Sequence, residues 1–210
     1  MKDPNTFKIR PSQLGKIMTN SKTKGELSKT AQTYLMEWYA DEHEEISSKY
    51  ITKGLMQEDN AIDFMATTLN YGIAEKNINI YSNEWCVGTP DVIIGDTVID
   101  IKCAWSQKTL LDSATNLNTD YEWQLRGYKM ITGCNKSILF YALMNTPASA
   151  NYGLEVIYEN LPTNQRWVAY QFKRDEFKEQ MIVDRVEECR KWLVKYDEEV
   201  KKKLGSITEI

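Results

Sequence analysis

The sequence predicts an α/β (α+β) fold in which a central mixed β-sheet is flanked by helices. Two short runs rich in Val and Ile, 92–94 and 98–101, surround a Gly-Asp pair and predict a β-hairpin. Segments with apolar residues three and four positions apart predict amphipathic helices on both sides of this hairpin. With 210 residues the chain is long enough to bury one core, so we expect a single domain over 1–210.

Helices dominate the structure expected before the hairpin. Ser12 is in position to cap a short helix that runs to Met18. After a polar loop, apolar stripes predict two helices, over 30–45 and 53–69. A short strand over 77–82 then leads toward the hairpin.

Helices and strands alternate after the hairpin. The segment over 107–119 predicts a loop, and the segment over 120–132 predicts a helix that ends at Gly133. The remaining expected strands lie over 137–144, 154–158 and 167–172. A long charged helix is expected over about 173–203, either continuous or broken once.

The charge of the chain is acidic overall but uneven. Lysine and arginine number 26 against 30 aspartates and glutamates, whereas proteins that wrap nucleic acid usually carry a basic surface. The exception is a basic segment over about 1–30. It could contact a phosphate backbone, or it could be a solvated and partly flexible terminus. Its bases are Lys2, Lys8, Arg10, Lys16, Lys22, Lys24 and Lys29, and its acids are Asp3 and Glu26.

Several classes of protein and site are disfavoured. The chain has neither a long apolar run nor a secretory signal, so we expect no membrane association and a cytoplasmic location, in the host cell if the protein is phage-encoded. His43, the only histidine, lies in an acidic stretch and is expected to be exposed and not catalytic. The four cysteines are widely spaced, which favours reduced thiols over a zinc or iron–sulfur site; they are Cys86, Cys103, Cys134 and Cys189.

The hairpin is the strongest functional signal. A turn at Gly95-Asp96 pairs positions 94 with 97, 93 with 98 and 92 with 99, which places Asp91 opposite Asp100. Lys102 shares the face of Asp100, because side chains alternate along a strand. Facing carboxylates repel each other unless a cation lies between them, and paired oxygens of this kind suit Mg²⁺. The alternative is a surface hairpin with ordinary charges at one end.

A glutamate in the second long helix is the next candidate. The apolar stripe of Leu55, Ile62, Met65 and Leu69 has Glu58 at its missing position, on the face expected to be buried. A buried carboxylate needs a cationic partner or a metal ion. Glu58 could therefore serve the hairpin site, or it could pair with a buried Arg or Lys or lie at the edge of the stripe.

The helix over 120–132 adds two polar side chains. Gln124 and Tyr128 are four positions apart and so share one helix face. A Gln amide can orient water or a phosphate, and a Tyr hydroxyl can donate to phosphate. Taken alone, this pattern is typical of an ordinary helix at the edge of a core.

The order of these motifs resembles a known nuclease superfamily. A helical Glu, then Pro90-Asp91, then Asp100-Ile101-Lys102, then Gln-x-x-x-Tyr resembles the RecB-like branch of the PD-(D/E)xK nucleases. Within it, the chain resembles phage lambda exonuclease and the YqaJ-like viral recombination exonucleases over most of its length. Two residues depart from the pattern: Asp100 stands where many relatives have Glu, and Ala104 where a Pro often follows.

The resemblance implies a PD-(D/E)xK restriction-endonuclease-like core and a site for one or two Mg²⁺ (or Mn²⁺) ions. The implied metal ligands are Asp91, Asp100, Glu58 and the carbonyl of Ile101. Lys102 would orient or deprotonate water or neutralise charge in the transition state, Gln124 would position water or Lys102, and Tyr128 would brace the site or contact phosphate.

The same resemblance implies a 5′→3′ exonuclease that acts on the ends of linear double-stranded DNA and leaves 3′ single-stranded overhangs for phage-type recombination. Arg10 and Ser12 match the segment that holds a 5′-phosphate. A homo-oligomeric ring trimer and a single-strand annealing protein as partner are also implied. The alternatives are a structure-specific or restriction-type endonuclease and an inactive DNA-binding module of the same fold.

Overall fold

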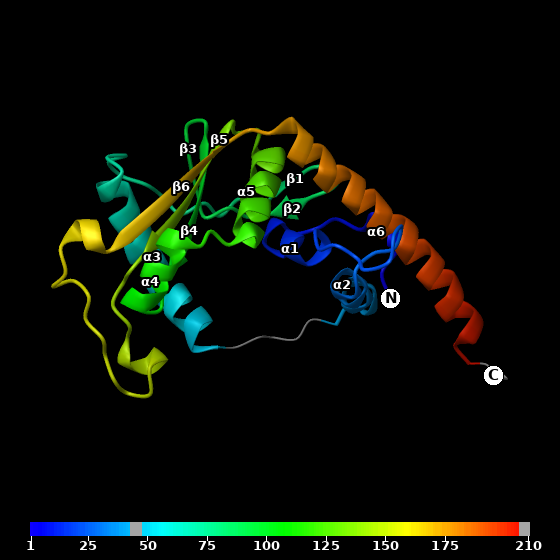
Figure 1. The fold of residues 1–210 in the computed structure, drawn as a ribbon, viewed down its shortest axis with the longest axis horizontal. Helices are drawn as coiled ribbons and strands as arrows, with labels where there is room; N and C mark the ends of the chain where they lie inside the picture. Colours follow the sequence, from blue (N-terminus) through cyan, green and yellow to red (C-terminus); the bar gives the residue numbers. More distant parts are fainter. Residues whose placement is uncertain (43–47, 206–210) are drawn as a thin grey trace.

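The computed structural model describes residues 1–42 and 48–205, and it confirms the predicted fold class: a mixed sheet flanked by helices (Figure 1). The helices are α1 (Leu14–Ile17), α2 (Lys29–Ala40), α3 (Lys49–Thr68), α4 (Gln107–Thr115), α5 (Thr119–Thr132) and α6 (Glu176–Lys203). The strands are β1 (Tyr81–Ser82), β2 (Val87–Gly88), β3 (Val92–Ile94), β4 (Thr97–Cys103), β5 (Lys136–Ala142) and β6 (Trp167–Lys173). Short 3₁₀ turns cover Pro4–Thr6, Pro11–Gln13, Ala148–Ala150 and Thr163–Gln165.

The central sheet is mixed, with the strand order β3-β4-β5-β6. β3 and β4 form the antiparallel hairpin, β4 and β5 run parallel, and β5 and β6 are antiparallel. The parallel pair requires a crossover connection, which α4 and α5 supply. β1 and β2 form a separate two-stranded ribbon just before the hairpin.

The two faces of the sheet bury different helices. On one face, α3 packs Ala61, Ile62 and Met65 against alternate residues of β3, β4 and β5. On the other face, Leu110 of α4 and Leu125 of α5 pack against the intervening residues of the same strands. Because adjacent strand residues point to opposite faces, both sides of β4 are buried, as expected for a central strand.

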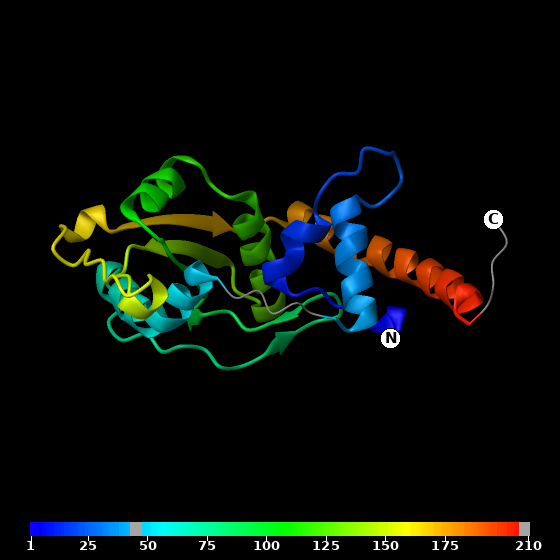
Figure 2. The same cartoon turned by 90° about the horizontal axis from the view of Figure 1, so that it is seen from below.

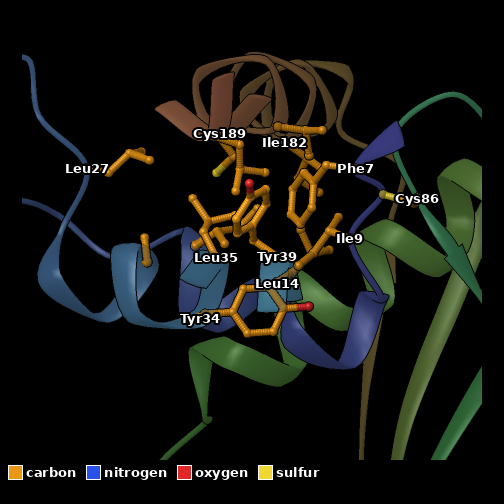
Figure 3. Close-up of a cluster of buried hydrophobic side chains, with 14 residues drawn as sticks. Phe7, Ile9, Leu14, Leu27, Tyr34, Leu35, Tyr39, Cys86, Ile182 and Cys189 are labelled. Carbon is orange, nitrogen blue, oxygen red and sulfur yellow. The ribbon is translucent and has the colours of Figure 1, made fainter. Parts of the chain in front are cut away.

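A third apolar cluster lies beside the sheet, where α1, α2 and α6 meet the N-terminal segment. Figure 3 shows Phe7, Leu35 and Cys189 converging beneath α6. The C-terminal half of α6 extends beyond the sheet, with α1 and α2 at its side (Figure 2). This helical lobe therefore has its own apolar interior, next to the sheet that carries the hairpin.

Several expected elements form as predicted. The hairpin register is the predicted one, with Val92 opposite Ile99 and Ile94 opposite Thr97. α5 ends at Gly133, whose φ of 78° is the left-handed conformation that favours glycine at a helix C-terminus. The strand predicted over 167–172 forms as β6.

Two elements after the hairpin differ from expectation. The segment predicted as a loop over 107–119 contains α4, because Ser106 caps its start by accepting a hydrogen bond from the Thr109 backbone and Leu110 is buried. The strand predicted over 154–158 does not form. There, only Val156 makes an isolated bridge, to Thr146, and Leu154 is 69% exposed because no strand lies beside it.

Element boundaries account for the other corrections. Ser12 lies inside a 3₁₀ turn and does not cap α1. Within 77–82 only Tyr81 and Ser82 pair as a strand. α2 ends at Ala40, and His43 lies outside the described residues.

The long C-terminal helix starts later than predicted and is unbroken. β6 continues through Lys173, and Asp175 caps α6 by accepting a hydrogen bond from the Lys178 backbone. Among the described helices, none combines the length and apolar character needed to span a bilayer.

Candidate active site

The hairpin brings two carboxylates together, as the register predicted. Asp91 lies just before β3, and its Oδ2 accepts a hydrogen bond from the backbone N–H of Ile101 at 2.7 Å. Asp100 is the fourth residue of β4. The contact with Ile101 fixes the Asp91 carboxylate against the strand that carries Asp100.

Asp100 is held from two sides and is only 1% exposed. Its Oδ1 accepts a hydrogen bond from the Gln124 amide at 2.7 Å. Its Oδ2 forms a salt bridge with Lys102 Nζ at 2.9 Å, which confirms that the two side chains share a face. Two carboxylates held close together, one of them fully buried, form the oxygen-rich pair that a divalent cation prefers.

The charges of the site are mutually dependent. Burial, together with the neighbouring Asp100, raises the pKa of Asp91 to about 7, and Glu58 adds to this effect. Burial acts to lower the pKa of the Lys102 ammonium, but Asp100 and Asp91 outweigh it, and the pKa lies above its ordinary value. Lys102 is therefore held as a cation beside a carboxylate pair that carries excess negative charge.

α5 supplies the polar side chains on the other side of Asp100. The Gln124 amide lies 3.3 Å from the Tyr128 hydroxyl, which in turn donates to the carbonyl of Thr89 at 3.3 Å. Burial and the charge of Asp100 raise the pKa of Tyr128, so its hydroxyl keeps its proton. Tyr128 thus joins α5 to the chain just before Asp91.

Tyr121 also belongs to this site, although no sequence argument singled it out. The ring centre of Tyr121 lies 4.8 Å from Lys102 Nζ, within the range of a cation–π contact. Tyr121, Gln124 and Tyr128 are three and four positions apart, so they share one face of α5. This spacing is the sequence feature that could have predicted Tyr121 as a residue of the site.

Glu58 is placed differently from the prediction. Leu55 is 70% exposed, so the proposed stripe does not begin there, and Glu58 lies at the edge of the buried face of α3. Its Oε2 pairs with Lys76 Nζ at 2.6 Å, as one of the alternatives anticipated, although Lys76 is itself partly exposed. Glu58 still lies near enough to Asp91 to raise the pKa of that carboxyl.

Lys53 is a second residue that the sequence argument missed. It is fully buried, and its Nζ donates to the carbonyls of Ala104 and Trp105 at 2.8 and 3.1 Å. Burial lowers its pKa to about 8. Lys53 therefore connects α3 to the chain that leaves β4 just after Lys102. Its helical spacing from Ala61 is the sequence feature that could have predicted its buried position.

The N-terminal segment lies beside the hairpin. Ile9 forms a parallel bridge with Cys86, and Pro11 packs where Gly88 and Gly127 leave room. A Cβ added to Gly88 would lie 2.8 Å from Pro11 and 3.4 Å from the Tyr128 ring. Both neighbours of Pro11, Arg10 and Ser12, are exposed.

The structure does not join Arg10 or Ser12 directly to the carboxylate pair. Within the described part of the chain, no hydrogen bond or ion pair links either side chain to Asp91, Asp100 or Lys102. Nor do the described residues contain a group of three His, Cys, Asp or Glu side chains close enough to hold a metal ion. Cys103 is half-buried, the other three cysteines are buried, and all four are free thiols.

Comparisons with known proteins identify the fold. Searches of family models and of curated proteins found no match. Among solved structures, a phage-related exonuclease from Haemophilus somnus 129PT is 24% identical, with a TM-score of 0.80 over 93% of this chain and 97% of that one.

A second solved protein has the same fold. The alkaline exonuclease LHK-Exo from Laribacter hongkongensis is 17% identical, with a TM-score of 0.67 over 95% of this chain and 94% of that one. A structure of LHK-Exo in complex with dAMP is 19% identical, with a TM-score of 0.66 over 93% and 92% of the two chains. The protein thus has a fold that is found in exonucleases.

Proposed function

We propose that the protein is a Mg²⁺- or Mn²⁺-dependent DNA exonuclease with a PD-(D/E)xK site. The observation that carries this proposal is the convergence of Asp91, Asp100 and Lys102, in which the buried Asp100 carboxylate lies beside a second carboxylate and pairs with Lys102 at 2.9 Å. The exonuclease folds of the solved relatives, one of them bound to dAMP, support DNA as the substrate.

The residues present fit a divalent cation. Asp91 and Asp100 would hold one or two ions, with the carbonyl of Ile101 and the more distant Glu58 completing the ligand set. When bound, the metal would polarise the scissile phosphate and lower the pKa of a coordinated water. The raised pKa of Asp91 indicates that this carboxylate pair favours a positive charge at this position.

The remaining residues orient the reacting groups. Lys102, held as an ammonium by Asp100, would neutralise charge that develops on the phosphate, a role that its raised pKa favours over proton abstraction. Gln124 fixes the orientation of the Asp100 carboxylate, and Tyr128 braces Thr89 next to Pro90-Asp91. Tyr121 limits the movement of the Lys102 side chain by its ring contact.

The polarity of digestion is part of the proposal. The segment around Pro11 packs against Gly88 and Gly127, which flank the carboxylate hairpin and Tyr128. Arg10 and Ser12 are exposed there, so they can contact the 5′-phosphate of a duplex end through charge-assisted hydrogen bonds. Digestion would then proceed 5′→3′ and leave 3′ overhangs for recombination, with an annealing protein as the partner that receives them.

The test compares two forms of one duplex. End-labelled linear DNA and covalently closed circular DNA are incubated with the protein and Mg²⁺, with the Asp100→Ala protein as the control for contaminating nucleases. We expect Mg²⁺-dependent release of nucleotides from the linear form and resistance of the circles. Rapid cutting of closed circles would indicate an endonuclease, and binding without cleavage of either form would indicate an inactive DNA-binding module.

A further inference from the structure

A second charged site lies in the helical lobe, away from the hairpin. A cavity of about 830 Å³ opens between the loop over 19–28, α2 and α6. Its volume is in the range of ligand-binding pockets. We call it the basic cavity, because five cationic and two acidic side chains line it in a chain whose net charge is −4. The cations are Lys24, Lys29, Arg185, Lys191 and Lys195, and the acids are Glu26 and Glu188.

The cations come from two distant parts of the chain. Lys24 and Lys29 belong to the basic segment over about 1–30, whose role the proposed active site does not explain. Lys191 and Lys195 are four positions apart on α6 and so share the face that borders the cavity. The fold therefore gathers onto one surface charges that the sequence keeps more than 150 positions apart.

Most of this charge is not neutralised within the described structure. Lys24, Lys191 and Lys195 are exposed, and none has a hydrogen bond or ion pair with another described residue. Arg185 pairs only loosely with Glu188, at 3.4 Å, and Lys29 donates to the neutral Gln32. Like charges gathered without counterions repel each other, so the arrangement favours an anionic ligand.

An aromatic ring and an apolar wall complete the cavity. Trp192 lines it and stacks on Tyr196, with ring centres 5.0 Å apart and planes at 11°. Leu27, which is buried in the cluster of Figure 3, holds the loop against α2 and α6. Cations beside an aromatic ring are the combination that single-strand-binding proteins use, the cations for phosphates and the ring for bases.

We propose that the basic cavity binds the sugar–phosphate backbone of single-stranded DNA. This inference rests on the proposed function, because an exonuclease that digests one strand of a duplex leaves the other strand single. The cavity shares no residue with the carboxylate hairpin or α5, and Figures 1 and 2 place α6 to one side of the sheet. The undigested strand would thus be held apart from the site of cleavage.

Binding is measured by fluorescence anisotropy with a labelled oligothymidylate of about 12 nucleotides, a length within the usual site sizes. The full chain carries Asp100→Ala, so that the probe is not digested. In this background, Lys191→Glu/Lys195→Glu is compared with Lys136→Glu/Lys173→Glu. The control pair is exposed, faces across β5 and β6 and changes the net charge equally.

We expect the Lys191/Lys195 variant to raise the Kd by about tenfold or more, and to reduce the salt slope by about 1.4 for two lost phosphate contacts. The control should change both quantities much less. Equal weakening in the two variants, or no weakening in either, would overturn the proposal.

A separate arm tests the activity on which the proposal rests. With Asp100 intact, the wild-type protein and the control Lys136→Glu/Lys173→Glu protein should digest a short linear duplex at the same rate. If the wild-type protein digests no DNA, the proposed function fails. In that case, the anisotropy comparison still decides whether the basic cavity binds single strands.

Discussion

At the scale of single residues, Asp100 has the most demanding environment of the site. It is buried, and it shares the site with a second carboxylate. Lys102 offsets part of the charge at 2.9 Å. A chain that keeps this unfavourable arrangement gains most when a cation enters it.

The first prediction follows from this crowding. Asp91→Ala, Asp100→Ala and Lys102→Ala should each lower turnover by about 10²–10³-fold or more, because each removes charge at the reacting phosphate. Without metal, Asp91→Ala should keep its melting temperature because it relieves repulsion, whereas Asp100→Ala should lower it because Lys102 and Gln124 lose their partner. Both should lose the stabilisation that Mg²⁺ gives the wild type. Asp63→Ala, on the exposed face of α3, is the matched control. Full activity of Asp100→Ala would exclude the metal site.

Glu58 can be separated from its ion-pair partner. Glu58→Gln should lower activity if Glu58 serves the carboxylate pair, whereas Lys76→Met removes the same ion pair from the other side and should leave activity unchanged. Both variants should change the free energy of unfolding by less than about 1 kcal/mol, because the pair is partly exposed. Turnover and urea denaturation are measured for both. Equal activity in the two variants would assign Glu58 to the ion pair alone.

Lys53 predicts a pH dependence of stability. Its pKa is about 8 in the folded protein and ordinarily 10.5, so between these values the unfolded chain binds more protons. The free energy of unfolding therefore falls by up to about 3 kcal/mol as the pH is lowered from about 10.5 to about 8, because the unfolded chain takes up a proton over this range that the neutral amine of the folded protein does not yet bind.

Urea denaturation of the wild type and of Lys53→Met tests the direction of this pH dependence. The stability of the wild type relative to the variant should increase from about pH 8 to about pH 10. The comparison between the two proteins cancels other groups that titrate there, the tyrosines and cysteines among them. A constant difference over this range would show that Lys53 has an ordinary pKa.

The contrast between Asp100 and Glu58 shows which side chains sequence reasoning can place. Asp91, Asp100 and Lys102 follow from local rules, since a two-residue turn sets the register and strands alternate their faces. The partner of Glu58 depends on where the loop after α3 places Lys76, 18 positions away. No periodicity in the sequence encodes that contact.

At the scale of elements, the contact between the N-terminal segment and α5 decides how Arg10 and Ser12 are presented. A Cβ at Gly127 would lie 2.6 Å from Leu14 and 3.1 Å from Pro11. The close approach of these two elements therefore depends on the absence of a side chain at position 127.

Gly127→Ala should accordingly displace the segment and destabilise the protein by about 1–3 kcal/mol. Gly54→Ala is the matched control, because no atom lies within 4 Å of its added Cβ and alanine favours the helix by about 0.5–1 kcal/mol. Wild type should digest duplex with a 5′-phosphate faster than duplex with a 5′-hydroxyl. Gly127→Ala and Arg10→Ala should both reduce this preference. If both variants keep the wild-type preference for a 5′-phosphate, the segment around Pro11 takes no part in the recognition of DNA ends.

Elements differ in how well local signals predict them. α5 has a clear stop at Gly133, and β6 has a neighbouring strand along its whole length. α4 was missed because few of its residues are apolar and its cap at Ser106 was the main signal. The segment over 154–158 has the composition of a strand but forms only one bridge among the described residues. Strand pairing depends on which distant residues lie beside the segment, and the composition of the segment does not contain that information.

At the scale of the whole molecule, the proposed function requires an acidic chain to bind DNA. Its 30 acidic residues exceed its 26 basic ones, so attraction to phosphate has to come from surfaces where the bases are concentrated. The basic cavity is one such surface. A ring of three chains around a channel, which we propose by resemblance to phage lambda exonuclease, would gather basic surfaces from several copies.

The ring leads to a prediction about mass and substrate together. We expect a particle of three times the chain mass of 24.4 kDa by light scattering after size-exclusion chromatography. Digestion of long linear duplex should be processive, because a closed ring cannot leave the strand between cleavage steps. Both are measured with the same preparation, and an unlabelled competitor duplex added after the reaction starts should not slow it. A monomer that resists such a competitor would exclude the ring, and selectivity for linear DNA would then depend on the segment around Pro11.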